Sequence, residues 1–218
     1  MTAHADLQAN SYEALSGPRL VFATGNTHKI SEFHAILEPF LGDIPTGSIA
    51  CLSDFSVPEP IEDGATFAEN ALIKARSLCN ATGIPAVADD SGLCVKIMGG
   101  APGIFSARWS GHHGDDQANL DLLLAQLCDV PDQLRQASFV CAAALVMPDG
   151  NEYVTHGEVH GVIIRKPRGS GGFGYDPIFV PEGFEVTSAE LTPEQKNALS
   201  HRGRALRSLA PHVVDIFR

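Results

Sequence analysis

The sequence lacks any long hydrophobic run. Nowhere in its 218 residues is there an apolar stretch near the roughly 18 residues that a membrane-spanning helix needs. Nor do residues 1–17 combine a basic start with an apolar stretch, which is the pattern of a secretory signal. We therefore expect no membrane span, no secretory signal and no membrane partner.

Positive charge is scarce. The chain has 15 Lys and Arg residues against 26 Asp and Glu, and its formal net charge is −11. Proteins that bind duplex nucleic acid normally carry a basic face, and none is visible here, so we expect no nucleic-acid partner. A polyanionic ligand would have to be small, and it would need a local cationic pocket or a metal ion.

Cysteine pairing motifs are also missing. The five cysteines are odd in number, form no C-x-x-C pair and have mostly apolar neighbours. This pattern is typical of reduced, buried thiols in a cytoplasmic protein. The residues concerned are Cys51, Cys79, Cys94, Cys128 and Cys141.

The chain is 44% hydrophobic, which is enough to expect a folded core. Its length fits one domain, with or without two lobes. Residues 1–18 are polar and weakly patterned, so we predict a flexible N-terminal extension followed by a single domain over 19–218.

Four segments have the apolar spacing or the capping residues of helices: 27–37, 66–83, 115–127 and 192–217. Pro39 is expected to limit the first helix. Capping boxes open the second and the fourth, at Thr66 and Thr192, and Gly83 closes the second.

Strands are predicted between these helices. Residues 19–26 are a short apolar run ending in a turn, 84–97 have the pattern of strand, turn and strand, and 137–164 form two long strands joined at 148–150. Alternating units followed by a hairpin predict an α/β fold with a mixed sheet.

The segment "TGNTHK", Thr24 to Lys29, lies where a strand passes into a helix. Gly25 permits a tight turn, and the free N–H groups and dipole of a helix start favour an anion. Lys29 adds a full charge. The spacing is not that of a Walker A loop, and an ordinary capped turn is an equal alternative.

Two acidic segments could hold a metal ion. In "ADDSGL" two aspartates end an apolar strand, and one could face a site while the other fixes the turn. Mg²⁺ prefers such carboxylates and keeps waters and phosphates as its other ligands. In "EPIEDG", Glu59, Glu62 or Asp63 could supply a second carboxylate. The alternatives are an Asx-type turn and solvated loop charge.

The segment "SGGFGYDPIF", Ser170 to Phe179, surrounds aromatic residues with glycines. Such a loop can cradle phosphate with N–H groups or hold the flat face of a base. In "EQKNALSHRG", Lys196, His201 and Arg202 bring three potential cations together, and an arginine can pair with O6 and N7 of a purine. A helix surface is the alternative.

A competing metal site is possible on a strand. His156, Glu158 and His160 alternate on one face and could bind zinc, although such residues are usually the wet side of a hairpin. His112 and His113 have the setting of loop residues.

Six segments together resemble the inosine triphosphate pyrophosphatase, or Ham1-like, family, whose bacterial members called dITP/XTP pyrophosphatases look closest. The segments are "ATGNTHKISEF", "TFAENALIKA", "ADDSGLCV", "GGAPGIFSARWSG", "GGFGYDPIF" and "AELTPEQKNALSHRG". They follow the family's order over about residues 19–210. The resemblance implies an elongated mixed sheet with flanking helices, two lobes around a central cleft, and a homodimer. It also implies Mg²⁺-dependent hydrolysis of ITP, dITP or XTP to the monophosphate and pyrophosphate, which cleanses the nucleotide pool.

The resemblance also assigns residues by position. Asp90 would be the catalytic acidic residue and a metal ligand, with Glu59 or Glu62 as the second metal carboxylate. The triphosphate would be bound by Thr24, Gly25, Asn26, Thr27, His28 and Lys29. Ser91 would touch the substrate, and the nucleoside would be framed by Phe173, Gly174, Tyr175 and Asp176. The pocket would be completed by Lys196, His201 and Arg202, with Lys29 and Lys196 offsetting the charge that develops on the phosphates. The alternatives are a pyrophosphatase for other modified nucleotides and a nucleotide-binding module without chemistry.

Overall fold

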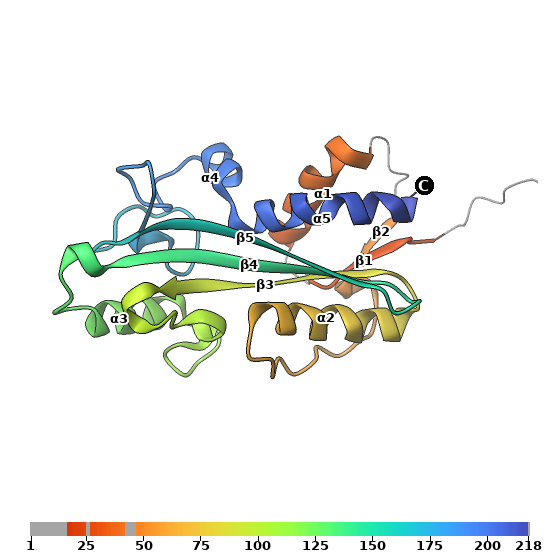
Figure 1. Cartoon of the computed structure of the whole chain (residues 1–218), viewed down its shortest axis with the longest axis horizontal. Helices are drawn as coiled ribbons and strands as arrows, with labels where there is room; N and C mark the ends of the chain where they lie inside the picture. The colour runs from red at the N-terminus through yellow and green to blue at the C-terminus, as the bar shows by residue number, and fades with distance from the viewer. Residues whose placement is uncertain (1–16, 25–26, 42–46, 218) are drawn as a thin grey trace, which may run out of the picture.

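A six-stranded mixed sheet organises the protein. The computed structural model describes residues 17–24, 27–41 and 47–217. The strands are β1 (Leu20–Phe22), β2 (Ile49–Cys51), β3 (Ala86–Val95), β4 (Gln136–Val146), β5 (Glu152–Ile163) and β6 (Phe179–Pro181), in the order β2-β1-β3-β4-β5-β6. β1 is parallel to both neighbours, and the other pairs are antiparallel. The predicted mixed sheet is confirmed, and its three long strands make the molecule elongated (Figure 1).

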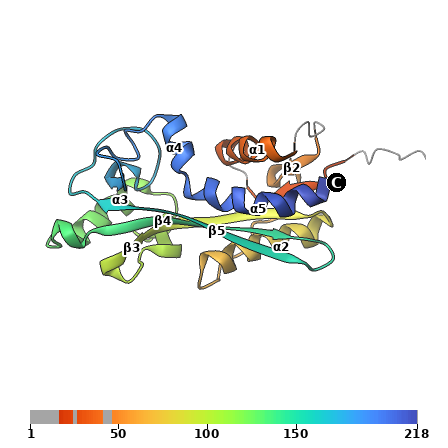
Figure 2. The same ribbon diagram turned by 45° about the horizontal axis from the view of Figure 1, so that its top comes forward.

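Helices cover both faces of this sheet. They are α1 (Thr27–Leu41), α2 (Phe67–Thr82), α3 (Asp116–Gln126), α4 (Pro193–Leu199) and α5 (His201–Phe217). Short 3-10 helices are η1 (Leu52–Asp54), η2 (Lys96–Met98), η3 (Gly103–Arg108), η4 (Asp132–Leu134) and η5 (Asp176–Ile178). α1 and α5 pack on one face and α2 on the other (Figure 2). Each face therefore has its own apolar core.

The predicted turn inside residues 84–97 is wrong. β3 is one continuous strand that pairs with β4 along its whole length, with Asp90 opposite Ala142 and Gly92 opposite Val140. Gly92 serves close packing instead, because a Cβ there would lie 2.4 Å from the carbonyl oxygen of Gly103. The glycine that suggested a turn is therefore present because the segment containing Gly103 packs closely against β3.

Two helix boundaries also differ from prediction. α1 continues past Pro39 to Leu41, because a proline in the last turn removes only one N–H group that would otherwise bond within the helix. The tail forms two helices, which meet at Ser200. The capping box that opens the first of them, with Thr192 and Gln195, is confirmed.

α2 begins and ends as predicted. The Thr66 side chain accepts a hydrogen bond from the Glu69 backbone N–H at 3.1 Å, and Gly83 takes the left-handed conformation at φ 69°. The Glu69 carboxylate accepts from the N–H of Ala65, one residue before the N-cap. Both ends of the helix that reaches the site are therefore fixed by local sequence.

Removing the Thr66 cap should lower stability. We expect Thr66→Ala to lose about 1 kcal/mol of unfolding free energy, because one N–H at the start of α2 loses its acceptor. That loss corresponds to a fall of roughly 2–4 °C in melting temperature for a domain of this size. Thr66→Ser, which keeps the acceptor, should melt within experimental error of the parent; equal melting of both variants would contradict the assignment.

The described residues include no helix that is both long and apolar enough to cross a membrane. All five cysteines are free thiols. Only Cys79 and Cys141 are buried, whereas Cys128 is exposed, so the expectation of buried thiols is right for part of the set.

Candidate active site

The site lies where β1 ends beside β3. The last β1 pair joins Phe22 to Val87, and the Ala23 N–H then donates to the Val87 carbonyl at 2.7 Å. Among the described residues, no strand pairs with β3 on this side beyond Val87. The buried Thr24 follows at the carboxyl end of β1, the usual place for ligands in parallel sheets.

The structure describes only part of the predicted phosphate turn. Gly25 and Asn26 lie outside the described residues. The backbone of Thr27, His28 and Lys29 forms the first turn of α1, and their side chains lie outside what the structure describes. The predicted change from strand to helix within this segment is confirmed.

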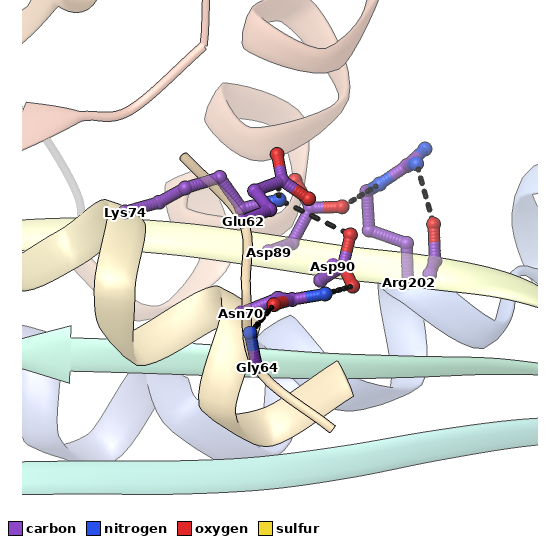
Figure 3. A network of polar contacts seen from close by, with 8 residues as sticks. Glu62, Gly64, Asn70, Lys74, Asp89, Asp90 and Arg202 are labelled. Atoms are coloured by element: carbon purple, nitrogen blue, oxygen red, sulfur yellow. Dashed lines mark hydrogen bonds and ion pairs between the residues drawn. The ribbon is translucent and has the colours of Figure 1, made fainter. Parts of the chain in front are cut away.

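Two carboxylates share one lysine in this region. Lys74 Nζ, from α2, lies 3.1 Å from Asp90 Oδ1 and 3.3 Å from Glu62 Oε1 (Figure 3). Asn70, one helical turn earlier, donates from Nδ2 to Asp90 Oδ2 at 3.2 Å. Its Oδ1 accepts the Gly64 N–H at 2.9 Å, which fixes the loop that carries Glu62. α2 thus joins the two acidic segments of the sequence.

With two carboxylates and one lysine, this cluster has a net charge of −1 when all three groups are ionised. Burial raises the pKa of Asp90, Lys74 lowers it and Glu62 raises it again, with a net increase. Burial lowers the pKa of Lys74, but Asp90 and Glu62 outweigh that effect and raise it. A charged lysine therefore faces two carboxylates, and a further cation would be favoured beside them.

Asp89 points to the opposite face of β3. Its Oδ2 accepts from Arg202 Nε at 3.0 Å, and Arg202 Nη2 lies 3.4 Å from Ser91 Oγ (Figure 3). The side chains of Asp89 and Arg202 are 2% and 8% exposed, so the pair is buried. The alternation of the two aspartates is as predicted, but Asp89 anchors the start of α5 and does not fix a turn.

The aromatic loop presents Phe173 to solvent. The Phe173 residue is 67% exposed, and Lys196 Nζ lies 5.1 Å from its ring centroid. Asp176 Oδ2 accepts from Lys196 Nζ at 2.6 Å and from the Phe173 N–H at 2.9 Å. A side chain at Gly172 would collide with both Asp176 and Lys196, so this loop closes tightly around a buried carboxylate.

Three other residues predicted to bind the nucleoside have structural roles. Tyr175 is buried, its hydroxyl donates to the Ser106 carbonyl at 2.9 Å, and burial raises its pKa. Gly174 has φ +57° and lets the chain turn from Phe173 into the core. His201 stacks on Phe139 of β4 with 5.2 Å between ring centroids.

The remaining acidic and histidine candidates lie on the surface. Glu59 and Asp63 are exposed, whereas Glu62 is half-buried beside Lys74. His156, Glu158 and His160 are exposed on one face of β5, as the wet side of a hairpin is expected to be. Within the described ranges, no three Cys, His, Asp or Glu side chains group closely enough to hold a metal by themselves.

The sequence interpretation missed Asn70 and Lys74. Both lie in the segment "ENALIK", four residues apart and hence on one side of a helix. Asn70 is fully buried among alanines and leucines of α2, which pack on the sheet. A polar residue on the buried stripe of an otherwise apolar helix face was the available signal.

A sequence model of the Ham1 family matches residues 20–212. The chain belongs to the Ham1 family. It is 57% identical over 198 residues to a dITP/XTP pyrophosphatase of Streptomyces coelicolor, a match that covers 91% of this chain and 98% of that protein. A Mycobacterium tuberculosis protein of the same description is 53% identical, with 88% and 94% covered. The predicted family resemblance is confirmed.

Solved structures agree with this membership. A nucleoside-triphosphatase / dITP/XTP pyrophosphatase from Mycobacterium abscessus superposes with a TM-score of 0.75 at 52% identity, covering 88% of this chain and 98% of that one. A HAM1 protein from Coxiella burnetii gives a TM-score of 0.82 at 40% identity, with 91% and 99% covered. The Ham1 fold therefore extends over nearly the whole described chain.

Proposed function

We propose that this Ham1-family protein hydrolyses non-standard purine nucleoside triphosphates (ITP, dITP or XTP) to the monophosphate and pyrophosphate. The observation that carries the proposal is the cluster of Asp90, Lys74 and Glu62 at the open edge of β3, beside the end of β1. Relatives described as dITP/XTP pyrophosphatases, which share more than 50% sequence identity with this chain, support the substrate class.

Asp90 and Glu62 would hold Mg²⁺. The donor set fits, since Mg²⁺ binds one or two protein carboxylates and completes its shell with waters and phosphate oxygens. Of the two glutamates left open by the sequence, Glu62 is the better ligand because it shares Lys74 with Asp90, whereas Glu59 is exposed. When bound, Mg²⁺ would neutralise phosphate charge and lower the pKa of a bound water.

The chain's own residues would set up the attack on the α-phosphorus. Asp90 would orient the attacking water, and Asn70 and Lys74 hold its two oxygens in place. Thr24 and the segment through Lys29 would bind the leaving pyrophosphate with helix N–H groups and the lysine charge. The Lys74 charge would offset the repulsion between the Asp90 and Glu62 carboxylates, which both contact it.

Base recognition would depend on the aromatic loop and on residues of α4 and α5. Phe173 would pack on the base, and Lys196 is already oriented over this ring by Asp176. His201 and Arg202 would donate to the 6-keto oxygen, and the hydrogen bond from Arg202 Nε to Asp89 would fix the orientation of the guanidinium group. An amino group at that position leaves donors unpaired at about 1–3 kcal/mol each, so two such losses would reject adenine roughly a hundredfold or more. Tyr175 would support the loop from behind.

The wider assignments from the sequence stay proposals. We propose one domain over residues 19–218, a homodimer and a cytoplasmic location, in keeping with the family resemblance and the free cysteines. Residues 1–16 of the predicted extension lie outside the described residues.

Pyrophosphate release from XTP, ITP, ATP and GTP in parallel tests the proposal. With Mg²⁺ we expect fast release from XTP and ITP and at least about a hundredfold less from ATP, since two recognition donors lose their partner there. EDTA should abolish release from all four. Equal turnover of all four nucleotides would contradict the base-recognition residues, and saturable binding without release would favour a binding module.

A further inference from the structure

Two consecutive N–H groups of the aromatic loop are each held by a carboxylate. The Phe173 N–H donates to Asp176 Oδ2, within the loop itself. The Gly174 N–H donates to Asp116 Oδ2 at 2.9 Å, across a separation of 58 residues. The loop that presents Phe173 is thus tied both to its own end and to the first residue of α3.

Asp116 is available for this contact because another residue caps the helix. The N-cap of α3 is Asp115, whose Oδ1 accepts the Ala118 N–H at 3.0 Å. α3 itself is fixed in the core by Leu120 and Leu123, which are 3% and 0% exposed. The Asp116 carboxylate therefore projects from a rigid element.

The loop and the first turns of α3 leave a space between them beside this hydrogen bond. A cavity of about 180 Å³ separates them, lined by Asp116, Gln117 and Leu120 on one side and by Gly172, Phe173 and Pro177 among the loop residues. Tyr175 packs with Leu120 and Leu123 in one apolar cluster, and the Gly174 to Asp116 hydrogen bond adds a polar contact between loop and helix beside the cavity. At the next residue along the loop, the Tyr175 hydroxyl donates to the Ser106 carbonyl and so holds the loop from the core side.

We propose that Asp116 is a positioning residue for the base platform, fixing the backbone at Gly174 and through it the ring of Phe173. The proposal rests on the proposed function, because it assumes that Phe173 packs on a purine. Asp116 would act on substrate binding and leave the chemical step at Asp90 unchanged. Its loss should therefore raise KM without lowering kcat.

Steady-state kinetics with XTP and Mg²⁺ on Asp116→Ala, Asp116→Asn and Asp121→Ala test this role. Asp121 is the matched control, since it is an exposed aspartate on the same helix whose described partner is Gln117. We expect Asp116→Ala to raise KM roughly five- to tenfold, because a charged acceptor for the loop is lost. Asp116→Asn keeps an acceptor oxygen and should restore most of the affinity, and kcat should stay within about twofold in all three variants.

The outcomes separate the inference from the proposed function. If Asp116→Ala and Asp121→Ala have the same KM, or if Asp116→Ala lowers kcat at unchanged KM, the positioning role is overturned. If the parent protein releases no pyrophosphate from XTP or ITP, the proposed function fails first. Asp115 stays in place in every variant, so α3 keeps its cap and melting temperatures should match.

Discussion

Asp90→Asn should abolish turnover of XTP and ITP while the protein stays folded. We expect kcat to fall by about a thousandfold or more, because the substitution removes a carboxylate of the proposed Mg²⁺ site, which is also the group proposed to orient the attacking water. Pyrophosphate release with saturating Mg²⁺ measures the loss. The side chain keeps its size, and its remaining oxygen can still accept from Asn70 or Lys74, so melting should change little.

An exposed aspartate provides the control for this prediction. Asp129→Asn makes the same change of charge at a surface position and should leave kcat unaltered. If Asp90→Asn keeps activity near that of the parent, the assignment of the active site to this edge of β3 is wrong. A large fall in melting temperature would instead indicate that Asp90 acts mainly in folding.

Gly157→Ala should strongly destabilise the protein. A Cβ at Gly157 would lie 2.0 Å from the His201 carbonyl oxygen and 2.6 Å from the Ala205 backbone nitrogen. Both are backbone atoms of α5, which packs against β5 and is tied to it by the Thr155 hydroxyl at 2.7 Å from the Ala205 carbonyl. The helix must move away as a unit, and we expect a cost of about 3 kcal/mol from overpacking.

That cost corresponds to a melting temperature roughly 6–12 °C lower. Because α5 begins with His201 and Arg202, the shift should also disturb the pairing of Arg202 with Asp89 and raise KM for XTP. Gly17→Ala, at a glycine with nothing within 4 Å of its Cβ position, should melt like the parent. Equal melting of Gly157→Ala and Gly17→Ala would show that α5 can shift without penalty.

Local sequence predicted the elements well where a chemical signal marks their ends. Thr66 and Gly83 delimit α2, and the turn at 148–150 joins β4 and β5, because caps and tight turns depend on residues a few positions apart. Prediction failed where contact with a segment distant in sequence determines the local conformation. Gly92 signals a turn by itself, but it is needed where η3 approaches β3, and nothing near it in sequence reveals that approach.

The candidate site divides in the same way. Asp90 was assigned through the family resemblance, whereas the choice of Glu62 over Glu59 required the position of Lys74. Lys74 and Asn70 were not selected at all, because their importance comes from the sheet on which α2 packs.

The α/β class, the family resemblance, the caps of α2 and the candidate chemical groups could all be predicted from patterns in the sequence. Motif residues and helix ends are properties of short segments, so they can be read without the rest of the chain. The folded arrangement was needed to show which glutamate contacts Lys74, that Asp89 pairs with Arg202, and that Asp116 contacts Gly174. These contacts join residues brought together by sheet order and helix packing, and their energies depend on burial, which no local pattern specifies.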